Sequence, residues 1–222
     1  MSPGASPGRL CETGRWRHMG STAVIDYDAG NLKSVEKALK ALGQEVVCTR
    51  DRSTVLSAER VILPGVGAFG DAMEKLTRYE LTDVIHEAVD QGTPFLGICL
   101  GLQLLFESSE ESPGIKGLGL LPGTIVRFPS RPGYKVPHMG WNRLKIRPEA
   151  RLYKGMETGE YVYFVHSYYV KADREEDVAA WSDYGFPFHA SVERGNLMGC
   201  QFHPEKSGDA GLQILRNFIE LT

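Results

Sequence analysis

The apolar and polar positions in the first half of the chain alternate between strand and helix spacing. Short runs rich in β-branched residues, typical of strands, occur at 22–27, 45–49, 60–64 and 94–98. Helical spacing of apolar residues follows at 31–42, at about 71–91 and directly after residue 98. The strand PFLGI, at 94–98, is apolar throughout, as strands buried on both faces of a parallel sheet are. The alternation predicts an α/β fold built on an open, mostly parallel sheet flanked by helices.

The second half of the chain has a different pattern. Between about 123 and 202, turn signals separate short strand-like segments, namely TIVRF, WNRLKI, YVYFVHSYYV, DVAAWS, FHASVE and LMGCQF. These predict extra, largely antiparallel strands added to the same domain. The segment 211–221, GLQILRNFIEL, has the spacing of an amphipathic helix. We interpret 21–222 as a single domain, and 1–20 as a disordered extension, a leftover of cloning or the product of an early start codon.

Composition excludes several classes of function. Net charge is −3 over 222 residues with both signs interspersed, which gives no electrostatic footprint for nucleic acid or a membrane surface. No apolar run approaches the roughly 20 residues that span a bilayer. The four cysteines have neither CxxC pairing nor metal-ligand spacing, so we expect a reducing, cytoplasmic location.

The segment GICLG, at 97–101, places Cys99 between a predicted strand and a predicted helix. It is the cysteine counterpart of the G-x-S-x-G nucleophile elbow, in which small neighbours let the backbone pack around a strained turn. A thiol at this turn faces the positive end of the following helix, which favours the thiolate. The backbone N–H of Leu100 can point at an oxyanion. The alternative is a buried cysteine with two incidental glycines, and a general base is needed to decide.

His203 supplies the candidate base. The segment QFHPE places it just past a predicted strand, with Glu205 two residues further on. In an extended segment this spacing puts both side chains on one face, where the carboxylate can accept the imidazole N–H and fix its tautomer. A surface His-Pro-Glu turn is the alternative, but the elbow and the His-x-Glu pair support each other.

A glycine-rich segment after the strand at 60–64 offers a second oxyanion donor. In LPGVGAFG, Val66 stands between two glycines, and its N–H is our candidate. The same segment matches the dinucleotide fingerprint G-x-G-x-x-G. We discount that match because the segment follows the third strand, Pro64 stiffens its entry, and no acidic residue ends a strand about 20 residues later.

Seven segments, taken in order, carry a resemblance to a known family. They are IDYDAGNLKSV (25–35), LPGVGAFGDAM (63–73), GICLGLQLLFESSEE (97–111), KGLGLLPG (116–123), PHMGWN (137–142), HSYY (166–169) and QFHPEKSG (201–208). From about residue 22 to 222, the chain resembles the class I (triad) glutamine amidotransferases, and more closely the glutaminase subunits of imidazole glycerol phosphate synthase. The resemblance implies the fold of that class, with a flavodoxin-like core.

The resemblance also implies a role for each matching residue. Cys99 would attack the glutamine side-chain amide to form a thioester, His203 would move the protons, and Glu205 would orient His203. The oxyanion hole would be formed by Gly65, Val66 and Leu100. The residues that would bind glutamine are Gln103, Glu111, Ser167 and Tyr168. Gln103 also follows Cys99 by four residues, on the same face of the predicted helix. Glu111 could instead belong to a solvated acidic run, and Tyr168 to the core.

A partner is expected as well. Free ammonia is mostly protonated at neutral pH, so a glutaminase that serves synthesis delivers ammonia directly. By resemblance the acceptor is a (β/α)8-barrel cyclase subunit in a heterodimer, which makes imidazole glycerol phosphate and aminoimidazole carboxamide ribonucleotide (AICAR) in histidine biosynthesis. This chain is too short to contain that barrel, which takes about 250 residues. Our candidate interface residues are Met139, Trp141 and Lys206, although Trp141 could be a core tryptophan. No metal or organic cofactor is implied.

Three other functions remain open at this point. An amidotransferase subunit of another pathway would share GICLG and HPE but not PHMGWN or HSYY. A cysteine hydrolase or peptidase acting alone would need no residue such as Gln103 near the nucleophile. A non-catalytic binding module would have no need of an intact Cys99, His203 and Glu205.

Overall fold

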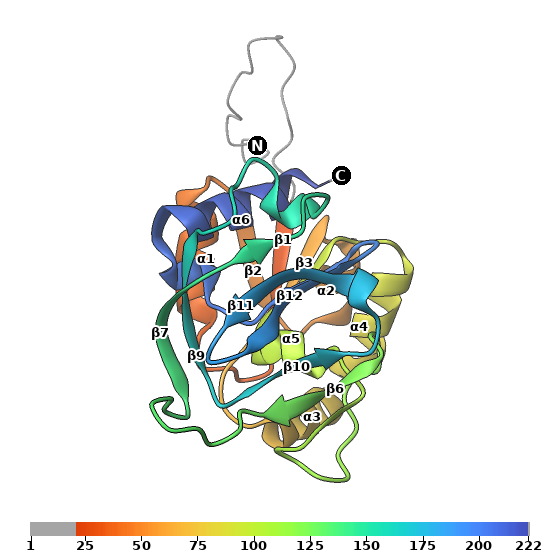
Figure 1. The fold of residues 1–222 in the computed structure, drawn as a ribbon. Helices are drawn as coiled ribbons and strands as arrows, with labels where there is room; N and C mark the ends of the chain where they lie inside the picture. Colours follow the sequence, from red (N-terminus) through yellow and green to blue (C-terminus); the bar gives the residue numbers. More distant parts are fainter. Residues whose placement is uncertain (1–20, 222) are drawn as a thin grey trace, which may run out of the picture.

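The computed structural model describes residues 21–221, and our interpretation of 1–20 concerns residues outside that range. An 11-stranded sheet runs through the molecule (Figure 1). Its parallel part has the order β2-β1-β3-β4-β13. The bounds of these strands are Ser21–Ile25 (β1), Glu45–Thr49 (β2), Arg60–Gly65 (β3), Phe95–Cys99 (β4) and Leu197–Cys200 (β13).

The sheet continues beyond β13 with mainly antiparallel pairs. Its path runs β13-β12-β10-β6-β5, with β11 pairing β12 and β8 pairing β11. The bounds are Ser108–Ser109 (β5), Gly123–Arg127 (β6), Lys145–Ile146 (β8), Tyr168–Ala172 (β10), Val178–Asp183 (β11) and Pro187–Arg194 (β12). A separate two-stranded ribbon is formed by β7 (His138–Arg143) and β9 (Tyr161–His166). The predicted α/β fold with added antiparallel strands is confirmed.

Helices cover both faces of the parallel part. The side chains of β1 alternate between two apolar clusters, with Ala23 and Ile25 in one and Val24 in the other. The first cluster is covered by α2 (Arg52–Ser57), α3 (Phe69–Arg78), α4 (Leu81–Asp90) and α5 (Leu100–Leu104), and the second by α1 (Leu32–Ala41) and α6 (Gly208–Glu220). Strands β1, β3, β4 and β13 are buried on both faces and lack the polar alternation of a half-exposed strand, whereas the edge strand β2 is largely exposed. No helix within residues 21–221 is long and apolar enough to cross a membrane.

The structure corrects four details of the predicted elements. The expected helix at 71–91 is two helices, because Glu80 has a φ of 55° that ends α3 and begins α4 at a new angle. The expected strand YVYFVHSYYV is broken at Ser167 into β9 and β10, which pair with different partners. Helix α2 was not predicted, although the Asp51 side chain caps it by accepting the Thr54 N–H. The segment LMGCQF supplies β13, which pairs antiparallel to β12 on one side, as expected, but parallel to β4 on the other.

Candidate active site

Cys99 ends β4 and precedes α5 in a strained turn. Its φ of 55° and ψ of −108° lie outside the regions that non-glycine residues favour. A Cβ on Gly101 would lie 1.8 Å from the carbonyl oxygen of Leu63, and one on Gly97 would lie 2.8 Å from the backbone of Gly101. Both glycines are therefore required for packing, because they let α5 start directly against β3 and β4. The two flanking glycines thus have the physical role that the elbow interpretation gave them.

His203 and Glu205 lie together on the segment after β13. The Nδ1–H of His203 donates to Oε1 of Glu205 at 2.8 Å, and both side chains are buried. Burial lowers the pKa of His203, but hydrogen bonding to Cys99 and to Glu205 outweighs burial and raises the pKa to about 9. The Asn31 side chain, just before α1, also donates to Oε1 of Glu205. Asn31 was not predicted, and no short-range pattern could have paired it with a residue 174 positions away.

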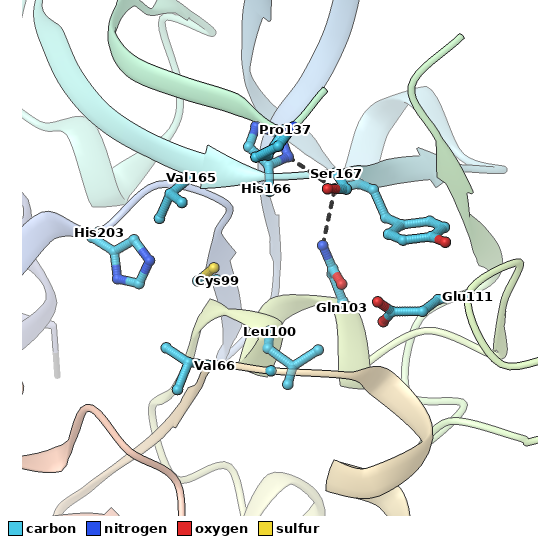
Figure 2. Close-up of a pocket in the computed structure, with 12 residues that line it drawn as sticks. Val66, Cys99, Leu100, Gln103, Glu111, Pro137, Val165, His166, Ser167 and His203 are labelled. Atoms are coloured by element: carbon cyan, nitrogen blue, oxygen red, sulfur yellow. Dashed lines mark hydrogen bonds between the residues drawn. The ribbon is translucent and has the colours of Figure 1, made fainter. Parts of the chain in front are cut away.

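A cavity of about 360 Å³ opens beside the nucleophile. Figure 2 shows Cys99 between His203 on one side and Gln103 with Glu111 on the other. The cavity brings together most of the predicted residues, with lining contributed by Val66, Cys99, Leu100, Gln103, Glu111, Ser167, Tyr168 and His203. Gly67, Pro137, Val165 and His166 line it as well and were not predicted. Its size is at the lower end of the range for small-molecule sites.

Glu111 is held in place at the edge of this cavity. Its Oε2 accepts the backbone N–H of Phe69 at 2.8 Å, at the start of α3. The neighbouring Glu110 accepts the backbone N–H of Arg127 at 2.8 Å. Glu111 is therefore half-buried and anchored, and its interpretation as a merely solvated charge is wrong, whereas Glu110 is exposed. The hydrogen bond from Phe69 uses Oε2 of Glu111 and not Oε1.

The predicted oxyanion segment lies alongside the nucleophile. Gly65 pairs in register with Cys99, and Val66 follows it with 40% of its surface exposed. A Cβ on Gly65 would lie 2.4 Å from the Tyr27 hydroxyl and 2.9 Å from Cβ of Leu100, so this glycine is required for packing. Gly67 is required for a different reason: its φ of 99° is a backbone conformation that residues with a side chain rarely adopt. Gly65 itself is not among the residues that line the cavity, although Val66 and Leu100 are.

The ribbon of β7 and β9 carries two of the three predicted interface residues, Met139 and Trp141. Alternate residues of β7 face outward, which leaves Met139 62% and Trp141 55% exposed. The alternative of a core tryptophan at Trp141 is therefore wrong. Tyr161 on β9 is 47% exposed, and Lys206 is exposed directly after Glu205.

Comparisons with known proteins show the family of the chain. Residues 23–221 match the family model "Glutamine amidotransferase class-I". The chain is 53% identical over 196 residues to the imidazole glycerol phosphate synthase subunit HisH of Bacillus cereus, covering 88% of this chain and 92% of the relative. It is 49% identical to the HisH subunit of Methanothermobacter thermautotrophicus, covering 90% of this chain and 98% of the relative.

Solved structures support the fold independently. A glutamine amidotransferase crystal structure matches with a TM-score of 0.70 at 21% identity, covering 89% of this chain and 97% of that one. A chain of PurLQS from Thermotoga maritima also matches with a TM-score of 0.70, at 22% identity, with 89% and 96% covered. At these sequence identities, the two matches show similarity of fold only. The family model and the HisH relatives go further: this chain belongs to the class I glutamine amidotransferases and, among them, to the HisH subunits of imidazole glycerol phosphate synthase.

Proposed function

We propose that Cys99, His203 and Glu205 hydrolyse the side-chain amide of glutamine to glutamate and ammonia. The observation that carries this proposal is the strained Cys99 turn, which opens on a cavity whose opposite wall holds His203 against Glu205. The sulfur attacks the amide carbon, and the negative charge develops on the amide oxygen. Backbone N–H groups of Leu100 and Val66 are our candidates for stabilising that oxyanion.

His203 moves the protons in both halves of the reaction. Its Nδ1–H is held by Glu205, which leaves Nε2 for the reacting atoms. It takes the proton of the Cys99 thiol and gives it to the leaving nitrogen as the C–N bond breaks, so that ammonia departs and a thioester remains on Cys99. Nε2 then takes a proton from a water molecule as that water attacks the thioester. Glutamate leaves, and the proton returns to the sulfur or stays on the imidazole.

The far end of the cavity fits the amino-acid portion of glutamine. Glu111 presents a carboxylate oxygen that can accept from an α-ammonium group. Gln103 has both amide hydrogens committed, to the Tyr168 carbonyl and to Oε1 of Gln201, each at 3.0 Å. Its own Oε1 faces Glu111 (Figure 2) and is left to accept from the same ammonium. The 167–168 backbone borders this end as well, and Ser167 and Tyr168 are proposed contacts of the substrate main chain.

The ammonia is proposed to pass to a (β/α)8-barrel cyclase subunit bound at the face of the β7–β9 ribbon. Two observations support this surface. Met139, Trp141 and Tyr161 are large apolar side chains left exposed on β7 and β9, and aromatic residues of this kind are typical of interface hot spots. Lys206 lies one residue beyond Glu205, which places a positive charge next to the triad.

The test of both the chemistry and the partner is glutamate release. It is measured for the chain alone and for the chain with a matching cyclase subunit and its nucleotide ligand. We expect low activity alone, a sharp rise in the complex, and none for Cys99→Ala. For the surface, Trp141→Ala should weaken association by about tenfold or more. The matched control is Val47→Ala, since Val47 is 39% exposed on β2, an edge strand of the other sheet. Equal association of both variants would contradict the proposed surface.

A further inference from the structure

A buried glutamine that the triad does not use faces the nucleophile. Gln201 directly follows β13 and is fully buried, and its Nε2 lies 3.8 Å from Sγ of Cys99. We propose that the Gln201 side-chain amide donates a hydrogen bond to the Cys99 sulfur and stabilises its thiolate, with Gln103 and the Tyr168 carbonyl fixing the orientation of that amide. The inference rests on the proposed function, because it assigns a partner to the nucleophile of that reaction.

The orientation of the Gln201 amide is fixed by the Tyr168 carbonyl oxygen, the acceptor at the other end of this series of hydrogen bonds. The Tyr168 carbonyl oxygen can only accept, and the group 3.0 Å from it must be the amide nitrogen of Gln103. The other hydrogen of that nitrogen then points at Gln201, whose nearest atom, at 3.0 Å, must be its oxygen. The nitrogen of Gln201 is left to face the sulfur. Turning either amide over would set two donors or two acceptors against each other.

Two buried histidines hold the same carbonyl from the other side. Nδ1 of His166 lies 2.8 Å from the Tyr168 oxygen and must donate to it, so the Nε2 of His166 accepts from Nδ1 of His138 at 3.0 Å. The Asn142 amide lies 3.4 Å from the remaining nitrogen of His138 and serves as its donor. Burial lowers the pKa of His138 to about 4 and that of His166 to about 3, so both rings stay neutral near pH 7. The Tyr168 carbonyl therefore stays in place over the working pH range.

A hydrogen-bond donor at this position stabilises the charged form of the sulfur more than its neutral form. A thiol is a weak acceptor, whereas hydrogen bonds to charged groups are among the stronger ones in proteins. The Gln201 amide therefore favours the thiolate over the thiol. The titratable groups around Cys99 are His203, with Glu205 behind it, the Tyr27 hydroxyl and the Cys200 thiol. Burial raises the pKa of Tyr27 and of Cys200, so among these neighbours the His203–Glu205 pair carries the charge near neutral pH, and the neutral Gln201 adds to it.

The test is the rate of Cys99 alkylation by iodoacetamide as a function of pH, followed on the Cys99 peptide by mass spectrometry. This reagent needs no glutamine and no partner. For Gln201→Met, which removes the donor at similar volume, we expect the profile to move up by about one pH unit, so that alkylation is about tenfold slower on the rising limb of the profile. Gln103→Met should give a smaller shift in the same direction, because it frees the Gln201 amide to turn. The matched control is Gln44→Met, a buried glutamine before β2 at the opposite end of the parallel strands.

A second variant keeps the test decisive if Gln201→Met fails to fold. Gln201→Glu keeps an acceptor for Gln103 and replaces only the donor, and its carboxylate against the sulfur should slow alkylation further. The inference is overturned if the alkylation profile of Gln201→Glu coincides with the wild-type and Gln44→Met profiles. The same result for folded Gln201→Met would also overturn it. The proposed function fails separately, by glutamate release that survives in Cys99→Ala, whatever the alkylation profiles are.

Discussion

Replacing Gly101 with alanine tests whether the nucleophile turn is fixed by backbone packing. The added Cβ would lie 1.8 Å from the carbonyl oxygen of Leu63. Close carbon–oxygen contacts in proteins are at roughly 3.3 Å, so the two groups must separate by roughly 1.5 Å. Leu63 is fully buried in β3, which pairs on both sides with β1 and β4. The strand cannot move without loss of its ladder, so α5 must move and carry the Cys99 turn with it.

The expected loss in the free energy of unfolding is about 3 kcal/mol, the upper end for added volume in a packed core. At an m-value of about 2 kcal/mol/M, the urea midpoint should fall by about 1.5 M. Gly92→Ala is the control: its φ of 82° strains an alanine by about 1 kcal/mol, but no described atom lies within 4 Å of the new methyl group. Urea unfolding and the alkylation rate of Cys99 should both be measured. Equal midpoints for the two variants, or unchanged alkylation in Gly101→Ala, would refute the packing argument.

Three further predictions concern the site and its surroundings. Asn31→Ala removes a donor from Glu205 and should lower kcat for glutamate release about tenfold with KM unchanged, whereas an unchanged kcat would show that Glu205 needs no second donor. The Tyr27 hydroxyl is buried with no hydrogen-bond partner among the described residues, so Tyr27→Phe should unfold at an equal or higher urea concentration, and a clear fall would contradict this. Burial lowers the pKa of His138 to about 4 and of His166 to about 3. In the unfolded chain these two histidines have ordinary pKa values near 6.5 and bind protons as the pH falls below that, whereas in the folded chain they stay neutral. Their contribution to stability is therefore full above about pH 6.5 and is lost as the pH falls toward 4. Urea midpoints that stay flat over this range would contradict that sign.

The elements nearest the nucleophile were predictable because their determinants are local. Gly97 and Gly101 flank Cys99 in the sequence, and the structure gives each a backbone contact that excludes a side chain. His203 and Glu205 are two positions apart and do pair as expected, but the extended segment assumed for them is wrong: Pro204–Lys206 form a turn of 3-10 helix. Short-range geometry of this kind is visible in a sequence.

The remaining parts depend on contacts between distant segments. Gln201 meets Cys99 only because β13 enters the sheet beside β4, and nothing in LMGCQF distinguishes a parallel neighbour from an antiparallel one. Asn31 reaches Glu205 from the other end of the chain. The break at Glu80 was missed because the apolar spacing continues through it, while the left-handed conformation that ends α3 leaves no signal at a glutamate.

The central claim is that Cys99 carries the glutamyl group during turnover. The most direct measurement is mass spectrometry of acid-quenched protein during turnover of isotope-labelled glutamine, in the complex with the cyclase subunit. The account predicts a labelled glutamyl adduct on the Cys99 peptide and none in Cys99→Ala. Continued glutamate release by Cys99→Ala, or turnover with the adduct on another residue, would contradict it.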